Sequence, residues 1–224
     1  MTRLLRSTIT RAFETDYTND YADRGKWVAY LAGRSEAAPE EKEGLGIPFD
    51  LSLAFHSDAG TTPDDSYIGT LAIYTLMCDD SRKYPDGSDR MAAREYSDYV
   101  QSQITNDVRA LHEPQWNRRQ LWDRSYSESR TTGVPGMLLE ILAHSNFADM
   151  KYGHDPAFRF TVSRAVYKGM LKFLANRYGK SYVVQPLPVN SLSAVFSGDN
   201  RIKLSWKPTE DSIEPTATPN GYMI

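Results

Sequence analysis

The pattern of apolar and polar positions along the chain predicts a mixture of helices and strands. Apolar residues recur at three- and four-residue spacing from Asp89 to Leu111 and again from residue 157 to Tyr178, which predicts two long helices with one buried face each. Asp155 and Pro156 supply an N-cap and a proline at the first helical position for the second helix. Residues 1–34 also have a mostly helical pattern.

Three short apolar runs lie between these helical segments. Ile47–Phe55, Tyr67–Leu76 and Val134–Leu142 are rich in apolar residues and are bounded by polar or turn-forming segments, as buried strands are. The polar, acidic stretch 35–46 predicts a surface loop. Strands that alternate with helices indicate an α/β domain, and the fold class that we expect is a three-layer arrangement of sheet and helices.

The pattern changes after Tyr182. Apolar residues alternate with polar ones on both sides of the turn-forming segment 197–200, which predicts a β-hairpin. The alternating apolar positions are Leu192, Ala194, Phe196, Ile202, Leu204 and Trp206. We therefore place a domain boundary at 180–186, with an α/β domain over 1–180 and a β-rich segment over 186–224.

Composition and charge exclude several classes of protein. The chain has 224 residues, of which 40% are apolar and 25% charged, so it can bury a core. The 26 basic and 29 acidic side chains give a net charge of −3, which argues against a nucleic-acid module. No apolar run approaches the ~20 residues of a membrane span. Cys78 is the chain's single cysteine, so neither an internal disulfide nor a cysteine-rich metal site is expected.

His56 is the first candidate for chemistry. It follows an apolar predicted strand and opens a polar loop, and ligands of α/β sheets bind beyond the carboxyl ends of strands. A neutral imidazole there is well placed to bind a metal ion. The alternative is a histidine that is simply hydrogen-bonded at the end of a strand.

Glu140 is the second candidate, because it interrupts the most apolar stretch of the chain. A carboxylate in a buried strand is costly unless it meets a cation, a metal ion or several donors, and such a group is a candidate general base. The alternative is strand alternation that points Glu140 to solvent. A third, weaker candidate is a substrate surface of mixed aromatic and basic side chains, which could equally cover a sheet edge; it comprises Trp116, Arg119, Trp122 and Arg124.

Two segments together resemble the zinc-dependent N-acetylmuramoyl-L-alanine amidases. The segment Ala54–Ala59 (AFHSDA) is similar to the family's strand that ends in a Ser-x-His-x-Asn type motif. The segment Val134–Glu140 (VPGMLLE) is similar to its Pro-x-x-Leu-x-Glu motif, and it is followed by Asn146, by Asp149 and by the 157–178 helix. The resemblance covers roughly residues 1–178 and implies the three-layer fold of sheet and helices that the amidases share with the zinc exopeptidases.

This resemblance implies that His56 is a zinc ligand and that Glu140 is the catalytic glutamate that acts on zinc-bound water. The family's other two zinc ligands, a histidine and a glutamate, have no counterpart before His56, so we expect the domain to be N-terminally incomplete, with zinc present in the full-length protein. Residues 186–224 resemble the start of a fibronectin type III sandwich. The implied function is hydrolysis of peptidoglycan, or of a related glycan, by an exported bacterial protein whose signal peptide is not in this chain.

Two other functions stay open. The chain could be a non-catalytic, amidase-like module that binds peptidoglycan or another polysaccharide through the Trp116–Arg124 region. It could also be an unrelated α/β hydrolase that acts on a carbohydrate. The oligomeric state is not indicated by the sequence.

Overall fold

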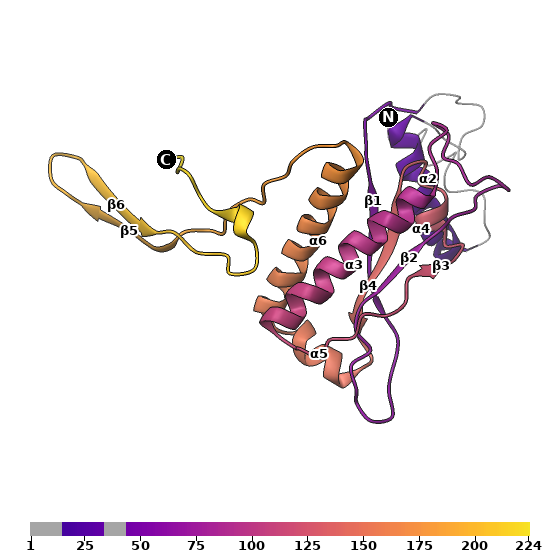
Figure 1. Cartoon of the computed structure of the whole chain (residues 1–224), viewed down its shortest axis with the longest axis horizontal. Helices are drawn as coiled ribbons and strands as arrows, with labels where there is room; N and C mark the ends of the chain where they lie inside the picture. Colours follow the sequence, from indigo (N-terminus) through magenta and orange to yellow (C-terminus); the bar gives the residue numbers. More distant parts are fainter. Residues whose placement is uncertain (1–14, 34–43) are drawn as a thin grey trace. The chain divides into compact units, whose positions relative to one another are not determined.

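The structure is a computed structural model that describes residues 15–33 and 44–224, and it is a mixed α/β fold, as the sequence predicts. The described residues divide between Leu174 and Ala175 into two compact units (Figure 1). This division falls a few residues before the predicted boundary, within the last turn of helix α6 (Pro156–Arg177). The identification of the first part as amidase-like and of the second as the start of a β-sandwich stays a prediction.

A four-stranded sheet in the order β1-β4-β2-β3 forms the centre of the first unit. β4 is parallel to β1 and antiparallel to β2, whereas β3 is parallel to β2. The strands are β1 (Ser52–Asp58), β2 (Leu71–Tyr74), β3 (Trp122–Asp123) and β4 (Gly136–Ala143).

Two of the three predicted strands differ from their expected bounds. β4 lies almost where it was predicted and β2 is shorter, but β1 is displaced toward the C-terminus by several residues. The reason is its pairing with β4, which begins at the 3.0 Å hydrogen bond from Ser52 N to Pro135 O and continues beyond Phe55 to Asp58. His56 therefore lies within a strand rather than after one.

Both long helices are confirmed. α3 (Met91–Leu111) and α6 lie next to each other along the sheet (Figure 1). They approach closely at Gly169, where a Cβ would lie 2.7 Å from the Cα of Val100. The predicted apolar stripe of α3 is fully buried except at its last position, Leu111; its buried members are Ala93, Tyr96, Val100, Ile104 and Val108.

Three shorter helices complete the first unit. They are α2 (Asp16–Ala32), α4 (Ser127–Arg130) and α5 (Phe147–Gly153). α2 confirms the helix predicted over 1–34 as far as the structure describes it, since residues 1–14 and most of the predicted loop 35–46 lie outside the described residues. α4 and α5 were not predicted, because segments this short carry no clear periodicity.

The two faces of the sheet have different neighbours. Met137 and Leu139 of β4 pack into the main core with α3 and α6, whereas Leu138 points to the opposite face, into a small cluster with Leu71 and Ile73. α2 packs on α4, and α4 in turn lies against β1 and β4. Because side chains alternate along a strand, Glu140 shares the face of Leu138 and lies on the side away from the main core.

The second unit contains the predicted hairpin. β5 (Asn190–Phe196) and β6 (Ile202–Lys207) pair antiparallel and are followed by the 3-10 turn η1 (Pro215–Ala217). The hairpin is confirmed; the fibronectin type III resemblance stays a prediction. Among the described residues of the whole chain, no helix has the length and apolar character needed to span a membrane.

Candidate functional site

A cavity of about 550 Å³ lies beside α2, α4 and the face of the sheet away from the main core. Its lining combines the aromatic rings of Tyr17, Tyr21 and Tyr126 with a group of ionisable side chains. Those ionisable residues are Asp20, Arg24, His56, Glu128, Arg130 and Glu140. The two residues that the sequence singled out are thus both in the lining of a single cavity.

His56 and Glu140 are direct neighbours across two parallel strands. They are register partners of β1 and β4, and each lies two residues beyond a member of the small apolar cluster, Ala54 and Leu138 respectively. This spacing places both side chains on the same face. The structure therefore brings together two residues that are 84 positions apart in the sequence.

Glu140 has a perturbed acidity. Burial raises its pKa above the ordinary value of a glutamate; the charges of His56 and Arg119 oppose this effect, whereas those of Asp58 and Glu128 add to it. Its Oε2 atom is shielded from solvent and has no hydrogen-bond partner among the residues that the structure describes. A carboxylate that is short of donors is more basic than a solvated one, which is the property a general base requires.

Glu128 is a site residue that the sequence did not indicate. Its Oε1 atom lies 3.0 Å from His56 Nε2 and accepts a 2.9 Å hydrogen bond from Arg24 Nη1. Only 10% of the Glu128 side chain is exposed. It lies in the stretch 112–133, which has no helical or strand period, so no pattern in the sequence set it apart.

The contact between α2 and α4 brings Arg24 to Glu128. A Cβ at Gly25 would lie 2.3 Å from Thr131 Oγ1 and 2.5 Å from Ser127 O, so only a glycine allows the helices to approach this closely. Ser127 Oγ also donates a 2.9 Å hydrogen bond to Ala22 O. The position of the Arg24 guanidinium is therefore set by backbone packing of two segments about 100 residues apart.

Of the four predicted substrate-binding residues, Trp116 is corrected by the structure. Its side chain is fully buried in the main core, and its Nε1 donates a 3.0 Å hydrogen bond to Thr70 Oγ1. A residue with no exposed surface does not meet a substrate in this conformation. The buried indole explains why an aromatic residue stands in a segment without an apolar period.

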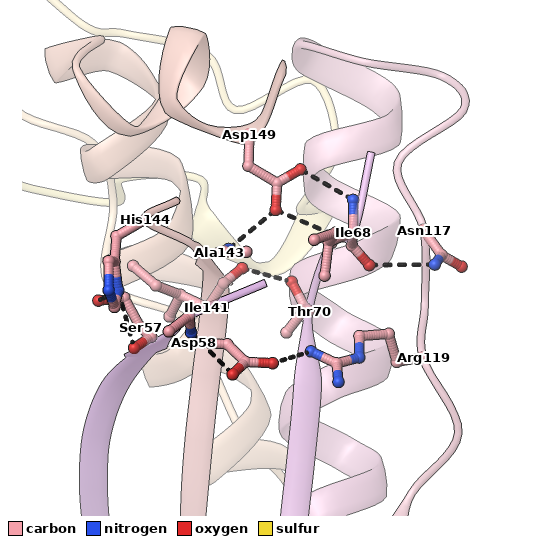
Figure 2. A network of polar contacts seen from close by, with 12 residues as sticks. Ser57, Asp58, Ile68, Thr70, Asn117, Arg119, Ile141, Ala143, His144 and Asp149 are labelled. Atoms are coloured by element: carbon pink, nitrogen blue, oxygen red, sulfur yellow. Dashed lines mark hydrogen bonds and ion pairs between the residues drawn. The ribbon is translucent and has the colours of Figure 1, made fainter. Parts of the chain in front are cut away.

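The other three predicted residues form a separate patch, in which Arg124 is exposed and Arg119 and Trp122 are partly buried. The Arg119 and Arg124 guanidinium groups lie 5.3 and 5.7 Å from the centre of the Trp122 ring. Arg119 also pairs with Asp58 at 2.7 Å (Figure 2). None of the three lines the cavity, but Trp122 packs against the small apolar cluster that contains Leu138, and Leu138 is in the cavity lining.

A buried carboxylate fixes the sheet next to this patch. Figure 2 shows Asp149 accepting backbone hydrogen bonds from the loop before β2 and from the end of β4. The donors are the N–H groups of Ile68, Gly69 and Ala143, at 3.1, 3.1 and 2.9 Å. Burial nevertheless raises the pKa of Asp149. Asp149 lies in the part of the chain that resembles the amidases, and its contacts here are with backbone amides.

The described residues do not fit the zinc site that the resemblance implies. A catalytic zinc site needs three protein ligands, and within residues 15–33 and 44–224 no group of three or more His, Cys, Asp and Glu side chains is arranged to hold a metal ion. His56 is the cavity's one histidine, and its Nε2 atom faces Glu128, which Arg24 also binds.

Comparison with known proteins gives only loose structural similarity. No protein-family model matches the chain, and no curated protein matches it. The chain is similar to an N-acetylmuramoyl-L-alanine amidase from Clostridium difficile 630, with 15% identity, a TM-score of 0.44, and coverage of 57% of this chain and 59% of that one. It thus spans about three fifths of that protein's length.

Two further solved structures are similar over more of the chain. The CwlD amidase from Clostridioides difficile, solved in complex with the GerS lipoprotein, has 17% identity and a TM-score of 0.48, with coverage of 75% of this chain and 69% of that one. The catalytic domain of CwlV, an N-acetylmuramoyl-L-alanine amidase from Bacillus (Paenibacillus) polymyxa var. colistinus, has 14% identity and a TM-score of 0.42, with coverage of 75% and 88%.

Proposed function

We propose that the chain is an amidase-like cell-wall hydrolase that cleaves the amide between the lactyl group of muramic acid and L-alanine in peptidoglycan. The observation that carries this proposal is the pairing of His56 with Glu140 on one face of the sheet, beside a cavity. These two residues belong to the two segments whose sequences resemble the amidase family. Peptidoglycan as the substrate, and export of the protein to reach it, are parts of the same proposal.

Glu140 is the residue that moves protons in the proposed reaction. Its carboxylate accepts a proton from the water that attacks the amide carbonyl and then passes that proton to the departing amine of L-alanine. The raised pKa supports this role, and so does the Oε2 atom that lacks a hydrogen-bond partner among the described residues, because both favour uptake of a proton. His56 lies beside it as a hydrogen-bonding group whose orientation is held by Glu128.

The patch of Arg119, Trp122 and Arg124 is the proposed contact for the glycan. The two guanidinium groups over the Trp122 ring offer hydrogen-bond donors to a sugar that carries a carboxylate or amide. The contact of Trp122 with the cluster that contains Leu138 would place a bound glycan near the cavity that Glu140 lines.

Release of new amino groups tests the proposal. Purified chain is incubated with peptidoglycan, and the free α-amino groups of alanine are measured by derivatisation. Wild type and an exposed control, Glu95→Gln on α3, should release them, whereas Glu140→Gln should reduce the release by at least about 10²-fold, the lower range of general base contributions. No release by wild type, or equal release by Glu140→Gln, would contradict the proposed activity.

A second candidate function is binding of peptidoglycan without cleavage. The observation that favours it is the engagement of His56 Nε2 by Glu128, which leaves that nitrogen facing a carboxylate already paired with Arg24. Co-sedimentation with insoluble peptidoglycan measures binding separately from cleavage. Arg124→Ala removes an exposed hydrogen-bond donor and should weaken binding by about two- to tenfold, the value of a single hydrogen bond of about 0.5–1.5 kcal/mol. Sedimentation without release of alanine amines would favour this second function over the first.

A further inference from the structure

Arg24 is held in the cavity by two carboxylates. Its Nη1 atom donates a 2.9 Å hydrogen bond to Glu128 Oε1, and its Nη2 atom pairs with Asp20 one turn earlier on α2. The close contact of α2 with α4 at Gly25 fixes the backbone next to Arg24. A guanidinium is always protonated in proteins, so this arrangement puts a permanent positive charge in the cavity lining.

Glu128 connects this charge to His56. The same oxygen, Oε1, contacts both Arg24 Nη1 and His56 Nε2, at 2.9 and 3.0 Å. Because the Glu128 side chain is 90% shielded from solvent, these contacts replace most of its hydration. An ionised carboxylate in this setting is stable only while it keeps such partners.

We infer that Arg24 is the resident cation of this cavity and that, through Glu128, it keeps divalent metal ions away from His56 Nε2. A zinc ion bound to that nitrogen would have to displace the carboxylate or share it with the guanidinium. The first leaves the shielded Glu128 carboxylate with Arg24 but without its contact to His56, and the second places two cations on one carboxylate, where their repulsion is only partly screened. This inference goes beyond the proposed function, because it concerns the charge of the cavity and not the reaction.

Zinc titration followed by histidine NMR tests this inference. The chain has four histidines, so an isotopically labelled sample gives four sets of imidazole signals, and His56→Gln identifies the signal of His56. Zinc chloride is added to wild type and to two variants, Arg24→Met, which removes the charge, and Arg24→Lys, which keeps it. Circular dichroism verifies that each variant is folded.

Wild type and the two variants should respond to zinc differently. Zinc should leave the His56 signals of wild type and of Arg24→Lys unchanged, whatever it does to the other histidines. In Arg24→Met the His56 signals should shift at zinc concentrations at least about tenfold below the highest concentration that leaves wild type unchanged, a difference of at least about 1.4 kcal/mol. A His56 shift in wild type would overturn the inference, and so would an Arg24→Met variant whose His56 signals stay unchanged. The titration uses no peptidoglycan, so failure of the proposed function would not affect it.

Discussion

A buried ion pair between α3 and α6 allows the strongest prediction about stability. Lys168 has no exposed surface and Asp107 has 4%, and Lys168 Nζ lies 2.7 Å from Asp107 Oδ2. Asp107 Oδ1 also accepts a 2.7 Å hydrogen bond from Gln103 Nε2. Both charges have lost their hydration, so each depends on the other for its stabilisation.

Removing one partner should be costly, and removing both should not. Lys168→Met leaves the Asp107 carboxylate buried without its cation, which should lower the free energy of unfolding by about 3–5 kcal/mol at pH 7. The double variant Lys168→Met/Asp107→Leu replaces both charges by apolar groups and should recover to within about 1 kcal/mol of wild type or exceed it. Lys172→Met removes a second, weaker charge that acts on Asp107; because Lys172 is only partly buried, this variant should cost no more than about 1 kcal/mol.

The pH dependence of Lys168→Met follows from Asp107. Burial already raises the pKa of this carboxyl in the wild-type chain, against the opposing effect of Lys168, so loss of Lys168 should raise it further. A raised folded-state pKa favours the protonated form, so the deficit of the variant should be smallest at acidic pH and should grow as pH rises through that pKa. Urea unfolding followed by circular dichroism at several pH values measures this. A loss below about 1 kcal/mol at pH 7, or losses that simply add in the double variant, would refute the reasoning.

Three further variants test the site and its supports. Because the pKa of Glu140 is raised in the folded state, wild type should lose stability as pH rises from acidic to neutral, and Glu140→Gln should not. The difference in the free energy of unfolding should grow by about 1.4 kcal/mol for each unit by which the folded-state pKa exceeds the unfolded one. Equal pH profiles of the two proteins would contradict this. Asp149→Asn puts an amide donor against backbone N–H groups and should lower the free energy of unfolding by about 1–3 kcal/mol in urea titrations. Gly25→Ala should separate α2 from α4 and lower the thermal midpoint, at a cost of about 1–3 kcal/mol that exceeds the gain in helix propensity.

The sequence could predict the elements whose pattern is long or strongly apolar. The three- and four-residue spacing in α3 and α6 reports directly on burial against the sheet, and both helices lie where that spacing places them. His56 and Glu140 could be selected because each interrupts or ends an apolar run, which is a local signal. That the two residues are neighbours in space could not be derived from local patterns, because it depends on the parallel pairing of β1 with β4.

Features that depend on contacts distant in the sequence were not predictable. Trp116 looks like a surface residue in an Arg-rich segment, but it completes the main core and hydrogen-bonds to Thr70. β1 is displaced because its bounds are set by the ladder with β4 and not by its own apolar run. Glu128 became a site residue only through the packing of α4 on α2, which no local pattern reports.

The chemistry of the cavity depends on Glu128 and Arg24, a pair of residues that no pattern in the sequence indicates. With His56 and Glu140 alone, the cavity would offer one imidazole and one carboxylate, a pair compatible with either a metal site or a metal-free one. Glu128 and Arg24 change this, because together they add one negative and one permanent positive charge next to His56 Nε2. The close helix contact at Gly25 holds these charges in place, so a single glycine in α2 bears on which cations the cavity admits.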